Sequence, residues 1–367
     1  MKLAGDRVFA FIVIILVVGG LALFSSAAIG LLARTDGTPW KIILTQIALG
    51  LAPGIAALIA LRFAKPDLIL AATIPFYVFA LIATALVFIP GIGVTANGAT
   101  RWIDIGFTTI QPGEFLKVGT ILMLSGYLAK TKNKIADFRY GLLPFGLIVG
   151  LPAVLLLAQP NTSTVLIIGA TSVVLYFLAG ARMRDFGVIF VTAIIGIAVL
   201  VSMRPYLMSR VMTYLDPSRD PLQSGYQIQQ SLIAIGSGGF LGRGFGQSVQ
   251  KFNYLPEPVG DSVFAVFGEE FGFVGGVLLI LLFVAFATRG LMIAAEAANM
   301  FGSLAATGLT LLIAFSAFMN IGAMLGIMPL TGLPLPFVSH GGTALLMVLA
   351  SVGIILNVAA HRTKRRS

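Results

Sequence analysis

The segment GSGGFLGRGFGQSVQKFNYLPEPVGDSVFAVFGEEFGF, residues 236–273, lies between two long apolar regions of the chain. It is polar and rich in glycine and proline, and it holds four of the 14 acidic residues: Glu257, Asp261, Glu269 and Glu270. Carboxylates beside so much apolar sequence are costly unless they have partners or a function. We therefore expect this segment to carry the chemistry of the protein.

The composition predicts that the rest of the chain lies in a membrane. Of 367 residues, 58% are hydrophobic and only 10% are charged, with a mean hydropathy of +0.99, whereas a soluble domain has about 25% charged residues. We expect one polytopic membrane domain over residues 1–367. The net charge of +10 is typical of basic cytoplasmic loops rather than of nucleic-acid binding, and the absence of cysteine excludes disulfides and thiolate metal sites.

Ten apolar stretches approach the length of about 20 residues that a membrane-spanning helix needs. They are Val8–Leu32, Ile42–Leu61, Leu68–Pro90, Gly113–Ala129, Tyr140–Ala158, Thr164–Gly180, Phe186–Met203, Ser262–Ala287, Phe301–Met328 and Gly341–Ala360. The first predicts a retained span rather than a removable signal peptide. The predicted fold is therefore all-α, with ten transmembrane helices and a long extracytoplasmic loop, residues 204–261, between spans seven and eight.

The basic residues predict the orientation. Fifteen of the 24 Lys and Arg residues fall on one set of alternate loops and on the two chain ends, and eight fall on the other set. Because basic residues accumulate on cytoplasmic loops, we expect both termini in the cytoplasm. Within the long outer loop, residues 204–216 and 225–235 have amphipathic patterns that predict helices on the membrane surface. The other long outer segment, residues 91–112, is expected to lie at the membrane interface.

Asp261 follows the turn PEPVG, residues 256–260, and precedes an apolar run. A structural interpretation makes it the N-cap of the next helix. A functional interpretation makes it a partly desolvated general base at the outer mouth of the bundle. Glu269 and Glu270 lie two turns farther along, where facing lipid would be costly, so at least one should face the bundle interior. That position suits a structural pair as well as a functional site.

Glu114 and Lys117, in the run IQPGEFLKVGT at residues 110–120, are three residues apart. On a helix they share one face, with Cβ atoms about 5–6 Å from each other. Lys117 is the only basic residue well inside a predicted span, and an ionisable residue there indicates a functional site. A mutually neutralised pair that fixes helix packing explains the pattern equally well.

Two further polar residues stand at the outer ends of predicted spans. Asn161 follows Gln159-Pro160 in a short turn, where asparagine is usually a turn residue. His340, in PFVSHGG at residues 336–342, begins the last span, and a lone histidine is more often structural than catalytic. The chain has no HExxH, no phosphate-binding P-loop and no histidine pair at ligand spacing, so we expect no zinc-type site.

The motifs taken together resemble one family. KFNYLPEPVGDSVFAVFGEEFGFVGG, residues 251–276, is similar to the signature of the SEDS family (shape, elongation, division and sporulation), which includes FtsW, RodA and SpoVE. Matching segments occur in family order at residues 97–106, 110–118, 157–167 and 332–358, so the resemblance covers essentially the whole chain. The chain departs from the commoner pattern in three places: Val259-Gly260 stand for His-Thr, Asn161 for Asp, and His340 for Tyr.

The resemblance implies a peptidoglycan glycosyltransferase that polymerises lipid II, the undecaprenyl-pyrophosphate-linked disaccharide-pentapeptide, at the outer face of the bacterial cytoplasmic membrane. The implied catalytic residue is Asp261. The implied substrate-binding residues are Lys117, Glu114, Arg101, Glu257, Glu270, Asn161 and His340. The exchange at Asn161 weakens the prediction of a charged contact from that turn.

The resemblance also implies partners and rival functions. The partner is a class B penicillin-binding protein, a single-span transpeptidase, within a division or elongation complex, and the run Asn-Tyr-Leu-Pro-Glu resembles FtsW more than RodA. Lys117, Arg101 and a divalent cation, Mg²⁺ or Mn²⁺, are candidates for balancing charge that grows on the pyrophosphate. A lipid II flippase or other transporter, and a division scaffold, are the alternatives. Both predict no glycan product and no strict need for a base at Asp261.

Overall fold

A computed structural model describes residues 6–33, 39–96, 98–106, 108–216 and 224–362. Among these residues the first half of the chain forms α1 (Arg7–Ile29), η1 (Gly30–Ala33), α2 (Pro39–Gln46), the π-helix η2 (Ile47–Leu51), α3 (Ala52–Phe63), α4 (Pro66–Leu86), α5 (Pro112–Thr131), α6 (Leu142–Ala158) and α7 (Thr162–Leu178). The second half forms α8 (Met183–Met203), α9 (Pro205–Leu215), α10 (Ser224–Ser237), α11 (Val263–Ala295), α12 (Met300–Met324) and α13 (Gly342–Ala360).

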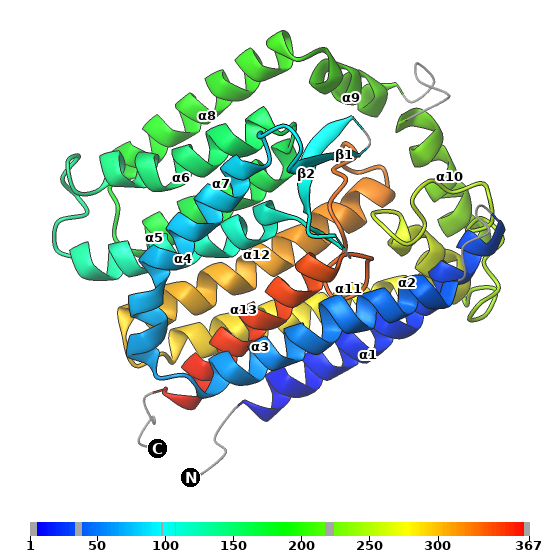
Figure 1. The fold of residues 1–367 in the computed structure, drawn as a ribbon, viewed down its shortest axis with the longest axis horizontal. Coiled ribbons are helices and arrows are strands. Elements are labelled where there is room, and N and C mark those ends of the chain that lie inside the picture. The colour runs from blue at the N-terminus through cyan, green and yellow to red at the C-terminus, as the bar shows by residue number, and fades with distance from the viewer. Residues whose placement is uncertain (1–5, 34–38, 97, 107, 217–223, 363–367) are drawn as a thin grey trace.

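The long helices run side by side along the long axis of the molecule (Figure 1). α12 lies at the centre, in contact with α5, α7, α11 and α13, and 78% of its most apolar stretch is buried. α8 is the opposite case, because its most apolar stretch has no buried residue. A helix that is apolar all round and uncovered by protein needs an apolar solvent, as a membrane provides.

The predicted helical membrane architecture is confirmed in its coarse form. Among the described residues, seven helices or continuous helical runs are long and apolar enough to cross a membrane, and α6 and α7 are shorter apolar helices. α5 is 20 residues long and carries the Glu114–Lys117 pair. Each of the ten predicted segments coincides with one of these helices or runs. The count of ten spans stays a prediction.

One segment differs from the expected helices and surface loops. Residues 91–112 contain a small antiparallel sheet of three strands in the order β1-β2-β3, formed by β1 (Gly93–Ala96), β2 (Ala99–Asp104) and β3 (Thr109–Ile110). The alternation of apolar and polar residues in this segment is the pattern of a strand with one covered face. This sheet places Arg101, in β2, beside the helical bundle.

The predicted long loop is largely ordered. α9 and α10 confirm the two helices expected from the amphipathic patterns. Residues 217–223 between them lie outside the described residues. After α10 the chain runs through turns and bends to α11, which is 33 residues long and has a non-helical residue, Gly272, at φ 63° and ψ −163°.

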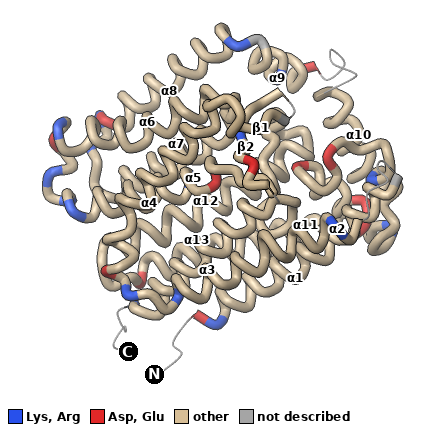
Figure 2. The backbone as a smooth tube through the Cα atoms, in the orientation of Figure 1, with Lys and Arg blue, Asp and Glu red and all other residues tan. Residues whose placement is uncertain are grey.

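Ion pairs close the end of the bundle at which both termini lie (Figure 1). Asp6 caps α1 by accepting a hydrogen bond from the N–H of Phe9 (2.9 Å). Its carboxylate also pairs with Arg289 of α11 (2.6 Å) and with Arg362 after α13 (3.4 Å). Arg362 bonds in turn to Glu296 (2.6 Å). Figure 2 shows that many other Lys and Arg residues gather at this same end.

Candidate active site

Asp261 lies in the turn that leads into α11, where its side chain is half-buried. Gln227 of α10 donates from Nε2 to Asp261 Oδ1 (3.1 Å) and to Ser262 Oγ (2.9 Å). The N-cap of α11 is Ser262, so the N-cap interpretation of Asp261 is wrong. Because a carboxylate offers about four lone-pair sites, the bond from Gln227 leaves Asp261 able to accept a further hydrogen bond from a substrate.

Two buried side chains from elsewhere in the chain hold the backbone of this turn. Asn320 of α12 donates from Nδ2 to the carbonyl oxygens of Asp261 and Leu333, both at 2.7 Å. Ser339 donates from Oγ to the carbonyl oxygen of Gly260 (2.6 Å). Buried backbone carbonyls are costly when unpaired, so these bonds fix the turn against α12 and against the segment before α13. With Gln227 of α10, three distant parts of the chain therefore set the position of Asp261.

The surroundings of Asp261 make its carboxyl group harder to ionise than that of an exposed aspartate. Desolvation, followed by the negative charge of Glu257, raises the pKa of Asp261 to about 6, while the bond from Gln227 and the charge of Arg210 act in the opposite direction. Glu257 has a left-handed backbone, φ 45°, which is unfavourable outside glycine and clusters at functional sites. A carboxyl group with a pKa near 6 is mostly ionised at neutral pH and is a stronger base than an ordinary Asp.

His340 adjoins the same turn. Its N–H donates to the carbonyl oxygen of Val259 (2.7 Å), and its ring stacks on Phe24 with centroids 5.7 Å apart. Gln46 bonds to the backbone on both sides of His340, donating to the preceding carbonyl (3.3 Å) and accepting from the following N–H (3.1 Å). The side chain of His340 is exposed. The structure thus brings His340 to the turn that carries Asp261.

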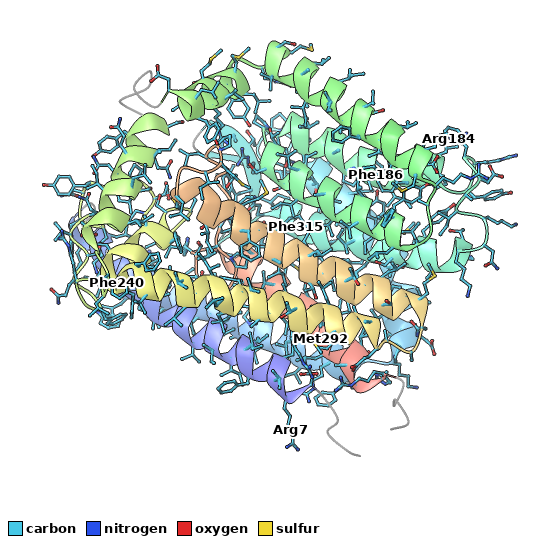
Figure 3. The ribbon with its side chains drawn as sticks, turned by 180° about the vertical axis from the view of Figure 1, so that it is seen from behind. Arg7, Arg184, Phe186, Phe240, Met292 and Phe315 are labelled. Atoms are coloured by element: carbon cyan, nitrogen blue, oxygen red, sulfur yellow. The ribbon has the colours of Figure 1, made fainter. Side chains whose placement is uncertain are left out.

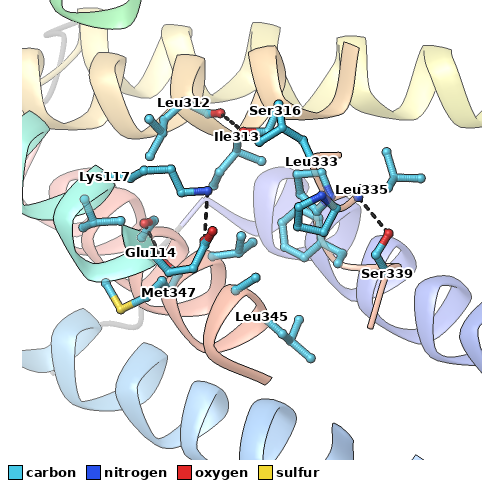
Figure 4. A pocket seen from close by; sticks show the side chains of 17 residues that line it. Glu114, Lys117, Leu312, Ile313, Ser316, Leu333, Leu335, Ser339, Leu345 and Met347 are labelled. Carbon is cyan, nitrogen blue, oxygen red and sulfur yellow. Dashed lines mark hydrogen bonds and ion pairs between the residues drawn. The ribbon is translucent and has the colours of Figure 1, made fainter. Parts of the chain in front are cut away.

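A small cavity of about 30 Å³ lies between α5, α12, α13 and the segment 333–339 (Figure 4). Lys117 Nζ is 2.9 Å from Glu114 Oε2 at its edge, and the two side chains are 9% and 5% exposed. The other lining residues are mainly apolar, but Ser339 also lines the cavity. Ser339 also holds the Asp261 turn, so it links the cavity that contains the ion pair to the turn of the candidate base.

Arg101 and Asn161 meet at the turn between α6 and α7. Arg101 Nε donates to the carbonyl oxygen of Gln159 (3.1 Å), and Nη2 donates to that of Pro160. Asn161 Oδ1 accepts from Thr164 Oγ1 (2.7 Å), which fits the turn interpretation of this residue.

Arg210 of α9 connects this turn electrostatically to the candidate base. Its charge acts on the pKa of Arg101 and on that of Asp261. Desolvation is the main cause of the lowered pKa of Arg101. Arg210 also donates from Nη1 to the carbonyl oxygen of Leu330 (3.1 Å), and its guanidinium lies 5.2 Å from the ring centre of Tyr206.

Glu269 and Glu270 form a separate cluster inside the protein. Lys251 Nζ is 2.7 Å from Glu270 Oε1, with both side chains 0% exposed. Ser26 of α1 donates to Glu270 Oε1 (2.6 Å), and Ser248 donates to Glu269 Oε2 (2.6 Å). The expected interior location is confirmed, and the contacts suit structural pairing. The substrate-binding role of Glu270 stays a prediction, and its buried carboxylate already has protein partners.

Sequence reasoning did not single out several side chains that build this site: Gln46, Gln227, Asn320 and Ser339. The sequence could have indicated Gln46 and Asn320, because an amide side chain inside an apolar helix must find a hydrogen-bond partner. No sequence feature distinguishes Gln227, since it is one of several polar residues on an amphipathic helix. Its role follows only from the packing of α10 beside α11.

The described residues offer no protein-only metal site. No group of three or more His, Cys, Asp or Glu in this part of the chain could hold a metal ion. Mg²⁺ and Mn²⁺ prefer several oxygen ligands, and the acidic residues of the Asp261 turn are Asp261 and Glu257. The donor set therefore does not fit a resident divalent cation without further ligands.

Comparison with known proteins agrees with this geometry. The model of the cell cycle protein family FtsW/RodA/SpoVE matches residues 6–364. Stage V sporulation protein E of Bacillus subtilis (strain 168) is 43% identical over 276 residues, 75% of this chain and 75% of that protein. The probable peptidoglycan glycosyltransferase FtsW of Thioalkalivibrio sulfidiphilus (strain HL-EbGR7) is 39% identical over 349 residues, 94% of this chain and 86% of that protein.

A solved structure extends the match to the fold. A chain from work on the structural coordination of polymerization and crosslinking by a peptidoglycan synthase complex has a TM-score of 0.81 and 29% sequence identity. The similarity covers 99% of this chain and 100% of that chain. The protein therefore belongs to the FtsW/RodA/SpoVE family of cell cycle proteins.

Proposed function

We propose that this protein is a peptidoglycan glycosyltransferase that polymerises lipid II into glycan strands. Relatives named as peptidoglycan glycosyltransferases, similar over most of this chain, support the activity. The observation that carries the proposal is Asp261, a half-buried carboxylate with a pKa of about 6 in a turn held by Gln227, Asn320 and Ser339. Ser339, which holds that turn, also lines the cavity with Lys117.

The reaction needs one protein base. The donor anomeric carbon carries pyrophosphate, which is already a good leaving group, whereas the acceptor sugar hydroxyl is a poor nucleophile at neutral pH. Asp261 takes the hydroxyl proton while the acceptor oxygen attacks the donor carbon from the face opposite the pyrophosphate. The bond from the donor carbon to the phosphate oxygen breaks, and the α-linked donor becomes a β-linked glycan. A pair of carboxylates, as in glycosidases, is not required.

Cationic side chains balance the charge that grows on the leaving pyrophosphate. Lys117 is proposed to contact it from the cavity, with Glu114 holding the ammonium in place until substrate arrives. A guanidinium has five N–H donors, and the backbone bonds of Arg101 use two of its nitrogens. Arg101 can therefore hold the turn at Asn161 and still contact a phosphate. We propose that Glu257 and His340, beside the base, contact the sugars.

Glu270 takes a different part in the proposal. Its buried bond to Lys251 supports a positioning role, in which the cluster holds the loop before Asp261 against α1 and α11.

The protein is a multi-pass protein of the bacterial inner membrane, and its finer topology is part of the proposal. We propose ten spans in one domain, both termini in the cytoplasm and the Asp261 turn on the outer face. Reporter fusions after Arg139 and Arg366 should read cytoplasmic, and one near Gln223 should read outside. Gln223 and Arg366 lie outside the described residues. A cytoplasmic signal near Gln223 would put Asp261 on the wrong side for wall synthesis.

A crosslinking enzyme is the proposed protein partner. The solved relative belongs to a peptidoglycan synthase complex that coordinates polymerization and crosslinking. A class B penicillin-binding protein, together with other division or elongation proteins, is the partner that this supports. Co-purification of the full chain with each such transpeptidase of the host would identify it.

The direct test is polymerisation by the purified protein. The full chain is incubated with fluorescently labelled lipid II, with any transpeptidase blocked by a β-lactam, and the products are separated on a gel. A ladder of uncrosslinked glycan strands is expected. Movement of labelled lipid II across vesicles without a ladder would favour the flippase instead, and binding without either would favour a scaffold.

A further inference from the structure

The break in α11 at Gly272 is filled by a loop from the preceding segment. Four backbone hydrogen bonds join the two: Phe273 N–H to Gly239 O (2.9 Å), Val274 N–H to Phe240 O (3.1 Å), Arg243 N–H to Glu269 O (3.0 Å) and Gly244 N–H to Glu270 O (2.9 Å). Broken helices are tolerated at membrane depth only where other groups satisfy the freed backbone. The loop does this for both sides of the break.

Glycine makes this close contact possible. Gly242 has φ +84° and Gly272 has φ +63°, both in the left-handed region. A Cβ at Gly272 would lie 2.3 Å from the nitrogen of Gly242, and a Cβ at Gly242 would lie 2.2 Å from the carbonyl oxygen of Glu270. A side chain at either glycine would therefore prevent the loop from packing against the break in α11.

The depth of the loop in the membrane can be measured along two helices. Arg289 of α11 pairs with Asp6 at the end of the bundle that holds the termini. Sixteen residues separate Arg289 from Phe273, a rise of about 24 Å. Nineteen separate Arg7 from Ser26 on α1, about 28 Å, and Ser26 bonds to Glu270. Since the hydrocarbon core is about 30 Å thick, the break and the loop beside it lie inside its far boundary.

The tip of the loop is apolar and uncovered. Phe240 is 68% exposed and Leu241 is 76% exposed, and the ring of Phe240 stacks on that of Phe273 (5.9 Å). The exposed side chains of α11 continue this surface through Leu278 and Leu281 at helical spacing. Figure 3 shows Phe240 beside the broken part of α11 and Met292 near the C-terminal end of that helix. One apolar surface thus runs from the membrane-spanning face of α11 onto the loop.

We propose that residues 238–246 form a re-entrant loop whose tip, Phe240 and Leu241, inserts among the lipid acyl chains of the leaflet farther from Asp6. The occupant of this surface is lipid, because the tip lies at hydrocarbon depth and continues a helix face that lipid must cover. Arg243 stands at the boundary, 41% exposed and paired with Glu269 (3.3 Å). The insertion anchors the segment that leads to Asp261 to that leaflet.

The absence of cysteine gives a clean background for the test. Phe240→Cys and Leu241→Cys are each labelled with a nitroxide in the full chain, reconstituted in vesicles of phosphatidylethanolamine and phosphatidylglycerol. Collision rates with molecular oxygen, which concentrates in lipid, and with a water-soluble nickel chelate are then measured. Leu278→Cys on α11 is the lipid control, and Gln229→Cys, exposed on α10, is the aqueous control. Phe245, in the same loop, is also exposed, so Phe245→Cys replaces a tip variant that does not fold.

The expected result is that labels at the tip behave like the label at Leu278, with high oxygen accessibility and almost no collision with the nickel chelate. Nickel accessibility equal to that at Gln229 would place the tip in water and overturn the proposal. Protection from both reagents would also overturn it, since the tip would then be covered by protein, such as a second copy of the chain.

Discussion

The two pairs of acidic residues in residues 236–273 have opposite environments. Glu270 has no exposed surface, and Lys251 lies 2.7 Å away. Asp261 is half-buried, has an amide donor, Gln227, on its carboxylate, and forms no ion pair with the described residues. Burial with a counter-cation yields a stable charge, whereas desolvation without one leaves a carboxylate with a raised pKa. The contrast supports a structural role for Glu269 and Glu270 and the proposed chemical role for Asp261.

The sharpest test of this contrast is Asp261→Asn. Asparagine has nearly the same size and can still accept the bond from Gln227, so the turn should survive. Loss of a general base typically costs about 100- to 10,000-fold in rate. We expect normal expression, thermal stability and lipid II binding but essentially no glycan ladder on a gel. Polymerisation at the wild-type rate would refute the catalytic assignment.

The scaffold half of the contrast predicts a loss of stability at Lys251. Removing one partner of a buried ion pair costs about 3–5 kcal/mol, so Lys251→Met should lower the thermal unfolding temperature of the purified protein markedly. Arg243→Met is the matched control, because Arg243 is partly exposed and its partner Glu269 keeps the bond from Ser248. The control should cost at most about 1 kcal/mol. Equal stability of the two variants would contradict the scaffold interpretation.

Lys117 stands between the two environments, because it is buried with a counter-charge and also lines the cavity. We expect Lys117→Met to remain folded but to lose polymerisation by about 10- to 100-fold, the value of one charge-assisted hydrogen bond. Glu114→Gln should be milder. Rates of product formation, with unfolding curves as the control, distinguish substrate binding by Lys117 from a purely structural ion pair. Near-normal product from Lys117→Met would rule out substrate binding by Lys117 and leave it only a structural role in the pair with Glu114.

The smallest expected effect is a shift of the pH profile. A base must be deprotonated, so activity should be present above a pKa of about 6 and lost as pH falls through it. Gln227 stabilises the ionised carboxylate, so Gln227→Leu should raise the pKa of Asp261 and move the acid limb to higher pH. Among the described residues, the charges of Glu257 and Arg210 act on Asp261, and His340 bonds to the turn that carries it.

The matched control for that measurement is Gln229→Leu, on the same helix but exposed to solvent. Its polymerisation rate should follow the wild-type curve at every pH between 5 and 8 at which the protein stays folded. An unchanged acid limb in Gln227→Leu would mean that this side chain is structural only.

Much of the fold could be predicted because membrane helices are local in sequence. A long apolar run must satisfy its backbone within itself, so its residues alone determine a helix. The strands over 93–110 were missed, because a short β pattern depends on what covers it. The break at Gly272 was missed as well, since it exists only where the loop at 238–246 supplies its hydrogen bonds.

The site shows the same division. The residue types and their order determined that Asp261, Glu114 and Lys117 bear charges next to apolar spans, and that such charges need a partner or a purpose. Only the tertiary structure decided which acid has a cation and which does not. Lys251 reaches Glu270 through a loop folded against α1, and Asn320 and Ser339 reach the Asp261 turn from α12 and the segment before α13. The physical reason is that desolvation and pairing depend on distances between side chains remote in sequence, which local pattern does not encode.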